Sequence, residues 1–268
     1  MSPGRGRIWI QGAGELASGV ALRLFRSGYA IIMAEIDNPL AVRRLVCFSE
    51  AVYEGTARVE EVLGVRLAAD QARYGLEQVA VVVDPEGEIL GKLGADAVVD
   101  ARLTKKAPAP LPRGKAPLIG LGPGFTCGLD ADLIIETHRG ACLGEVISQG
   151  QAAANTGVPG VIGGESARRV VRAPVAGRLE PQVSIGDMVE QGQVLGSVAG
   201  EAIFSPLSGQ VRGLVHPRAE LLPGEKVGDV DPRGLAVNPN RVSDKALAVA
   251  GGVLEALLRR KVLPTFEA

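Results

Sequence analysis

Two glycines and two carboxylates near the start of the chain have the types and spacing needed to hold the phosphates and ribose of a nucleotide. Gly12 and Gly14 follow an apolar stretch, Glu15 comes next, and Glu35 lies 21 residues after Gly14. Gly12 permits a tight turn, and Gly14 lets the backbone approach a pyrophosphate because it has no Cβ. The N–H groups of the following helix would face the anion, and a carboxylate at position 35 would accept from ribose hydroxyls. We therefore expect Gly12, Gly14, Glu15 and Glu35 to bind a nucleotide.

The elements around these residues favour that interpretation. Residues 7–11 form a short apolar run, a helix-like run extends to Gly28, and residues 30–36 form a second apolar run. This strand–helix–strand order is typical of a dinucleotide-binding unit. The alternative is a tight turn in a Rossmann-like fold that has lost its cofactor.

A second glycine-rich loop is expected opposite the first. Residues 120–126 and 136–140 each directly follow a short apolar run. Because parallel strands deliver the loops at their carboxyl ends to one crevice, we expect Gly122, Gly124 and Arg139 to shape the far side of the nucleotide site. The alternative for the glycines is a turn that needs positive φ.

The apolar runs predict the fold of the first part of the chain. Residues 79–83, 95–100, 117–121 and 133–135 are short and apolar, whereas residues 57–76 are charged and expected to be helical in part. Continuous apolar strands mixed with helices indicate an α/β fold with a mainly parallel sheet covered on both faces. We assign residues 1–166 to a Rossmann-like nucleotide-binding domain.

An internal repeat marks a change of architecture. Residues 173–179 (APVAGRL) recur as residues 205–211 (SPLSGQV). The pattern resembles the half-repeat of the biotinyl/lipoyl family, which implies an all-β barrel-sandwich hybrid over residues 167–230. In that family the modified lysine lies on the hairpin joining the halves, but residues 197–204 contain no lysine. We therefore expect a docking or lid element without biotin or lipoate.

The last segment, residues 231–268, is expected to return to the first domain. Ser243 and Asp244 suit a helix N-terminus, and Ala246 to Leu258 is rich in Ala, Val and Leu. An apolar helix needs a partner surface, so we expect it to pack on the Rossmann-like sheet. The barrel-sandwich would then be an insertion.

Composition excludes several function classes. The 268 residues are 46% hydrophobic and 22% charged, and the formal net charge of −1 argues against nucleic acid or an anionic membrane as the main partner. No apolar run reaches the ~20 residues of a membrane-spanning helix. The start of the chain lacks the pattern of a signal peptide, and the three cysteines, Cys47, Cys127 and Cys142, form no CxxC pair. We expect a cytoplasmic protein without a metal site.

The residues identify no catalytic group. No Tyr-x-x-x-Lys pair and no Gly-Lys-Ser/Thr loop occurs in the sequence. His138 is either an exposed loop residue or a ligand of the crevice. Cys127 and Cys142 are either buried small side chains or thiolates that handle sulfur or selenium.

The motifs together are similar to one family, the accessory proteins of selenium-dependent molybdenum hydroxylases (the YqeB type). The segments that carry the resemblance are residues 12–24, 39–44, 48–53, 120–126, 136–140, 231–234 and 243–246. One departure is His138, which stands where the family pattern has asparagine, so any family role for that side chain does not transfer.

The resemblance implies a factor that helps mature a molybdenum hydroxylase of the xanthine dehydrogenase kind. A nucleotide or the dinucleotide form of the molybdenum cofactor would be the ligand, the hydroxylase would be the partner, and self-association stays open. Two alternatives also stay open. One is an NAD(P)-dependent oxidoreductase with Arg43 and Arg44 near the adenosine end, and the other is a non-catalytic scaffold.

Overall fold

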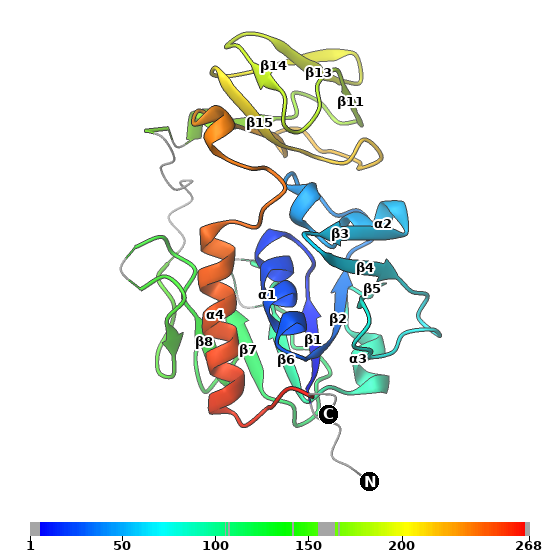
Figure 1. Cartoon of the computed structure of the whole chain (residues 1–268), viewed down its shortest axis with the longest axis vertical. Helices are drawn as coiled ribbons and strands as arrows, with labels where there is room; N and C mark the ends of the chain where they lie inside the picture. The colour runs from blue at the N-terminus through cyan, green and yellow to red at the C-terminus, as the bar shows by residue number, and fades with distance from the viewer. Residues whose placement is uncertain are drawn as a thin grey trace.

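A computed structural model describes residues 6–104, 106, 108–140, 142–154, 164–165 and 167–265. A nine-stranded sheet forms its lower part (Figure 1). The strands are β1 (Arg7–Gln11), β2 (Ala30–Glu35), β3 (Thr56–Val59), β4 (Val62–Arg66), β5 (Val79–Val83), β6 (Ala97–Asp100), β7 (Leu118–Leu121), β8 (Leu133–Ile135) and β9 (Val146–Ile147). Their spatial order is β3-β4-β5-β2-β1-β6-β7-β8-β9, and only the edge pairs β3–β4 and β8–β9 are antiparallel. The predicted α/β fold with a mainly parallel sheet is confirmed.

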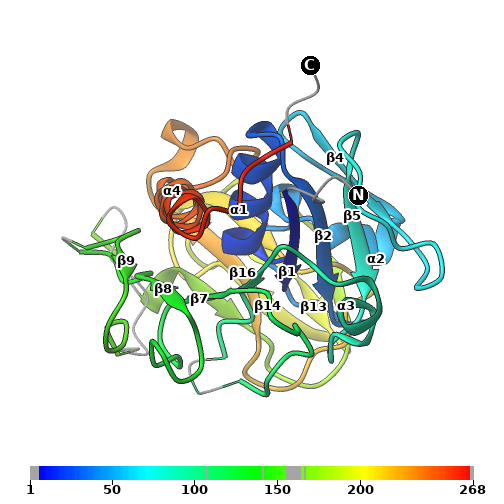
Figure 2. The same cartoon turned by 90° about the horizontal axis from the view of Figure 1, so that it is seen from below.

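Helices cover both faces of this sheet. The helices are α1 (Glu15–Arg26), α2 (Glu50–Glu54), α3 (Glu88–Leu93) and α4 (Asp244–Arg259), with 3-10 turns η1 (Arg44–Val46), η2 (Ala167–Arg169) and η3 (Gly234–Ala236). Helices α1 and α4 pack side by side on one face and α3 on the other (Figure 2). Gly19 permits the close approach, since a Cβ there would lie 2.7 Å from the Ala246 Cβ.

The helix expected from Ser243 is present and returns to the main sheet. Ser243 is its N-cap, and its hydroxyl accepts a hydrogen bond from the Ala246 N–H at 3.2 Å. Val249, Val253 and Leu257 are fully buried in the core shared with α1 and the sheet. The apolar face of α4 therefore has the partner surface that the sequence required.

The expectation of helix within residues 57–76 was wrong. Residues 56–66 form the antiparallel pair β3–β4, joined at Glu60 and Glu61. Buried and exposed residues alternate along β3, with Ala57 and Val59 inside and Arg58 outside. This period of two is the pattern of a half-buried strand, and the charges lie on its outer side.

Residues 167–231, here named the β-unit, form two small antiparallel sheets with a core of their own. Their strands are β10 (Val170–Arg172), β11 (Leu179–Pro181), β12 (Met188–Val189), β13 (Val194–Val198), β14 (Glu201–Phe204), β15 (Gly209–Leu214) and β16 (Lys226–Asp231). The two copies of the repeat lead into β11 and β15, and the lysine-free segment forms the β13–β14 hairpin. The domain boundaries at 166/167 and 230/231 stay predictions, and residue 166 lies outside the described residues.

The β-unit lies over the carboxyl ends of the parallel strands (Figure 1) and is tied to the segment after β2. The Tyr53 ring stacks on His216 with centroids 4.2 Å apart, and His216 Nε2 lies 2.8 Å from Glu54 Oε1. The Asn38 amide bonds both the N–H and the carbonyl of Glu220. A Cβ at Gly213 would lie 2.5 Å from the Val42 carbonyl oxygen. These contacts hold the two parts in one arrangement.

Candidate functional site

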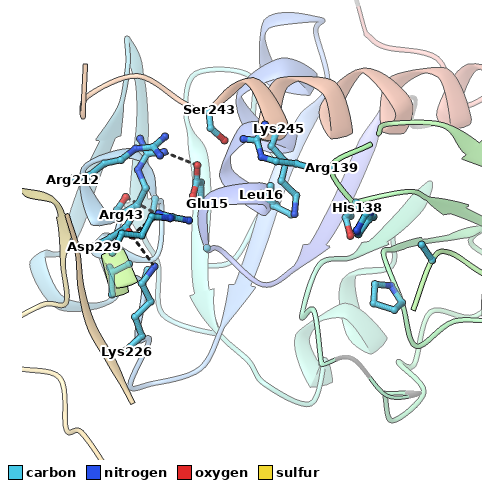
Figure 3. Close-up of a pocket in the computed structure, with 18 of the residues that line it drawn as sticks. Glu15, Leu16, Arg43, His138, Arg139, Arg212, Lys226, Asp229, Ser243 and Lys245 are labelled. Carbon is cyan, nitrogen blue, oxygen red and sulfur yellow. Dashed lines mark hydrogen bonds and ion pairs between the residues drawn. The ribbon is translucent and has the colours of Figure 1, made fainter. Parts of the chain in front are cut away.

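A pocket of about 480 Å³ lies between the main sheet and the β-unit (Figure 3). The described residues that line it are Gly14, Glu15, Leu16, Ala41, Val42, Arg43, Cys47, Pro123, Thr137, His138, Arg139, Ala153, Ala154, Arg169, Arg212, Lys226, Asp229, Ser243 and Lys245. They come from the segments after β1, β2, β7, β8 and β9, from the starts of α1 and α4, and from η2, β15 and β16. The pocket therefore occupies the usual ligand position of an open α/β sheet and has the β-unit as one wall.

Two helices begin at this pocket. Gly14, at the N-cap of α1, has no side chain to accept from the first-turn N–H groups, and Leu16 of that turn lines the cavity. Ser243 and Lys245 place the start of α4 in the same cavity. The first N–H groups of a helix lack intrahelical partners and carry the positive end of the helix dipole. Both helices thus contribute positive potential to one space.

The side chains add more positive charge. Among the described lining residues six are cationic, and two, Glu15 and Asp229, are acidic, which leaves a surplus of four positive charges (six minus two). The six are Arg43, Arg139, Arg169, Arg212, Lys226 and Lys245. A partly enclosed space with such a surplus favours an anionic occupant.

Three arginines of this group are nearly buried. The side chains of Arg43, Arg212 and Arg169 are 5%, 8% and 10% exposed. Arg43 pairs with Glu15 at 2.7 Å, and Arg169 pairs with Asp229 at 2.5 Å. In all three guanidinium groups the Nε is buried and has no hydrogen-bond partner among the described residues. A buried donor without a partner is unfavourable, and an anion in the pocket would stabilise the positive charge of these three groups.

The pKa directions agree with this surplus. Burial lowers the pKa of Lys226 and Lys245, and the nearby Arg169 and Arg139, respectively, lower them further. Burial, together with the positive charge of Arg43, also lowers the pKa of Arg212. Positive groups whose pKa is lowered by one another and by burial become more stable when an anion enters.

The structure brings three of the predicted site residues into the pocket. Gly14 and Glu15 lie at the start of α1, and Arg139 lies across the cavity, where it forms a bidentate pair with Asp244 at 2.6 and 2.7 Å. Arg139 is thereby fixed at the start of α4, and this pair raises its pKa.

The other four predicted residues are not among the described lining residues. Gly12 has φ +106°, and a Cβ there would lie 3.0 Å from the Ala101 carbonyl oxygen. Gly122 and Gly124 have φ +73° and +110°, and Cβ atoms would press on Thr137 and on the Lys106 carbonyl. The backbone conformation by itself favours glycine at these three positions, and their contact with a nucleotide stays a prediction. Only Pro123, between the last two, lines the pocket.

Glu35 supports the first loop from behind. Its carboxylate accepts from the backbone N–H groups of Ala13 at 2.7 Å and Ile36 at 2.9 Å. Burial raises its pKa, although these two hydrogen bonds act in the opposite direction. The structure thus gives Glu35 a positioning role on the glycine loop, and its contact with a ribose stays a prediction.

The remaining candidates divide between the pocket and the surface. His138 is exposed at the pocket edge. Cys142 is exposed, and a hydrogen bond to Glu145 raises the pKa of its thiol, which disfavours the reactive thiolate. Cys127 is half-buried, and its thiol lies 3.3 Å from the Asp132 carbonyl. Within the described part of the chain no group of three or more potential metal ligands occurs.

Sequence reasoning missed the wall that the β-unit supplies. Arg212 lies in β15, whose residues are all buried, and Lys226 and Asp229 lie in β16. A charged residue within a strand buried on both faces is the signal that could have identified them, because charges are rarely buried unless they are paired or functional. Arg169, which directly precedes β10, carried no such signal.

The chain is a homologue of a bacterial protein. The chain is 45% identical over 255 residues to the Escherichia coli (strain K12) protein YqeB, which is described as uncharacterized. The match covers 94% of this chain and 47% of YqeB, so the chain spans about half the length of that relative. No protein-family model matches the chain.

Solved structures give distant matches. An aspartoacylase family protein from Mesorhizobium loti is 24% identical over 24% of this chain and 23% of its own, with a TM-score of 0.22. A succinylglutamate desuccinylase/aspartoacylase from Rhodobacter sphaeroides is 23% identical over 32% and 29% (TM-score 0.23). The apo structure of the ectoine utilization protein EutE (DoeB) from Ruegeria pomeroyi is 11% identical over 85% and 86% (TM-score 0.25). At these TM-scores the matches carry no argument. No helix in the described residues is long and apolar enough to cross a membrane.

Proposed function

We propose that this chain is an accessory factor for a molybdenum hydroxylase of the xanthine dehydrogenase type. It would bind a nucleotide-bearing ligand, specifically the dinucleotide form of the molybdenum cofactor, in the pocket between the main sheet and the β-unit. The maturation role rests on the resemblance of the sequence motifs to the YqeB-type accessory proteins, and the 45% identity to YqeB is consistent with it.

The observation that carries the ligand class is the positive surplus of the pocket at the starts of α1 and α4. Phosphate groups are the anions that a glycine loop followed by a helix accommodates most readily. Arg43, Arg212 and Arg169 line this space with buried positive charge. A phosphate-bearing ligand would balance that charge.

The β-unit would have a different task from that of the biotinyl/lipoyl proteins that its repeat resembles. Its joining hairpin, residues 197–204, has no lysine to carry biotin or lipoate. Instead the β-unit closes one side of the pocket with Arg169, Arg212 and Lys226. A factor built in this way would hold the ligand between two parts and present it to the hydroxylase.

Deleting the gene for this chain in its own host tests the role. An accessory factor is needed for the activity of its client and not for the client's synthesis. The hydroxylase should therefore be present and folded but largely inactive, while molybdenum enzymes of other classes stay active. Complementation with Gly14→Asp should fail if ligand binding matters, and Gly14→Asn is the uncharged control.

Two outcomes would separate the alternatives. Full hydroxylase activity in the deletion strain would contradict the maturation role and favour the NAD(P) oxidoreductase. Full complementation by Gly14→Asp would favour the scaffold, because that variant adds a negative charge at the start of α1.

A further inference from the structure

The cations of the pocket form two clusters, one on each side of the start of α1. In Figure 3 Arg43, Arg212 and Lys226 lie to one side of Leu16, and Arg139 and Lys245 lie to the other. Both clusters line the same cavity. The first is named the β-unit cluster and also includes Arg169; the second is named the α4 cluster.

The β-unit cluster holds more positive charge than its own carboxylates balance. The Asp229 carboxylate forms ion pairs with both Arg169, at 2.5 Å, and Lys226, at 3.8 Å. Arg212 lies 3.3 Å from Asp231, which is also held by Arg233 at 2.8 Å. Two carboxylates thus face three cations of the β-unit cluster and, in addition, Arg233, which lies just after the β-unit.

Arg43, the remaining cation of the β-unit cluster, is paired with the Glu15 carboxylate. The Nε groups of Arg43, Arg169 and Arg212 are buried without a partner among the described residues. The β-unit cluster therefore offers positive charge to an anion, and the described residues leave three of its guanidinium groups incompletely hydrogen-bonded.

The α4 cluster is a second, separate source of positive charge. Arg139 is paired with Asp244, whereas Lys245, which also lines the cavity, forms no ion pair within the described part of the chain. The Ser243 hydroxyl accepts from the Ala246 N–H, and the start of the 16-residue α4 carries the positive end of its helix dipole. One anionic group can lie here while another lies against the β-unit cluster.

We infer that the pocket binds a diphosphate-bearing ligand whose two phosphoryl groups span the start of α1, one contacting the β-unit cluster and the other the α4 cluster. This deepens the proposed function and rests on it for the choice of phosphate over other anions. The β-unit is then an anion-binding half of the site. Neither half alone suffices for full affinity.

Calorimetric titration of the whole chain with inorganic pyrophosphate and inorganic phosphate tests this inference. Pyrophosphate should bind at least about tenfold more tightly, because it reaches both clusters and phosphate reaches one. Lys226→Gln and Lys245→Gln should each remove most of that advantage and leave phosphate affinity changed by less. Arg212→Gln should act like Lys226→Gln, and Arg212→Lys should partly restore binding.

Arg178→Gln is the matched control, because Arg178 belongs to the β-unit but forms an exposed pair with Glu220 and is not among the described lining residues. It should bind pyrophosphate as the wild type does. The half-exposed Lys226 keeps the test valid if the buried Arg212 variant fails to fold.

Two results would overturn the inference. One is wild-type protein that binds neither anion or binds both equally, and the other is unchanged pyrophosphate affinity in both lysine variants. Neither result would bear on the maturation role, which the deletion experiment tests separately. Conversely, full hydroxylase activity in the strain that lacks this chain would contradict the proposed function, whereas the titration result would still hold.

Discussion

Replacing Gly14 with aspartate places a carboxylate at the start of α1 while leaving the fold intact. Gly14 has φ −70° and ψ −172°, which any residue can adopt, and a Cβ there meets none of the described atoms within 4 Å. Aspartate is also a favourable N-cap residue. We therefore expect the free energy of unfolding to stay within about 1 kcal/mol of the wild-type value or to rise.

The loss of binding can be estimated from Coulomb's law. Two unit charges about 5 Å apart at an effective dielectric constant of about 20 interact by about 3 kcal/mol. The six lining cations and solvent screen part of this repulsion. A loss of about 1.5–3 kcal/mol corresponds to about a 10- to 100-fold lower affinity for pyrophosphate. Stability and affinity should thus respond differently to one substitution.

Gly14→Asn is the matched control, since asparagine has the same shape and capping ability as aspartate without the charge. Calorimetric titration of both variants with pyrophosphate measures the effect of the charge alone. Urea unfolding of both variants checks that the fold is retained. Pyrophosphate affinity in both variants equal to that of the wild type would refute the assignment of an anion to the start of α1.

Three further outcomes follow from the same structure. Because the pKa of Lys226 and of Lys245 is lowered, both lose their charge at a lower pH than an ordinary lysine, whose pKa is about 10.4. As the pH rises towards that value, pyrophosphate affinity should therefore fall relative to that of a variant in which both lysines are replaced by arginine, and a constant ratio would contradict this. Gly19→Ala should lower the free energy of unfolding by about 1–3 kcal/mol, because the added Cβ would lie 2.7 Å from a side-chain carbon of α4. Gly251→Ala, where the described atoms leave open space, should raise it by about 0.5–1 kcal/mol, and equal effects in urea unfolding would argue against the α1–α4 packing. Intact-mass measurement of protein made in a host with active biotin and lipoate ligases should show no adduct, because residues 197–204 lack lysine, and an adduct there would contradict the assignment.

Local patterns predicted the elements whose signal lies in adjacent residues. The strand–helix–strand unit of β1, α1 and β2 follows from apolar runs around Gly12 and Gly14. Helix α4 follows from its Ser243 cap and apolar face. The hairpin at residues 56–66 was missed because its outward charges obscured a period-two pattern of buried residues.

The site was only half predictable for a physical reason. Gly14 and Arg139 follow strands of the parallel sheet, and the topology of such sheets brings their loops together. Arg212 and Lys226 belong to a separate pair of sheets, and nothing in their local sequence says which surface that pair covers. Contacts such as the stacking of Tyr53 on His216 determine that arrangement, and contacts of this kind appear only in the folded chain.

Native mass spectrometry of the protein purified from its own host tests the central claim, which is that the pocket between the main sheet and the β-unit holds a phosphate-bearing ligand. The account predicts a bound species that carries phosphate on the wild-type chain and is lost from the Gly14→Asp variant. Nucleotide analysis of the released ligand would then show whether it is the molybdenum cofactor dinucleotide. Wild-type chain that carries no such species, even when incubated with pyrophosphate, would contradict the account.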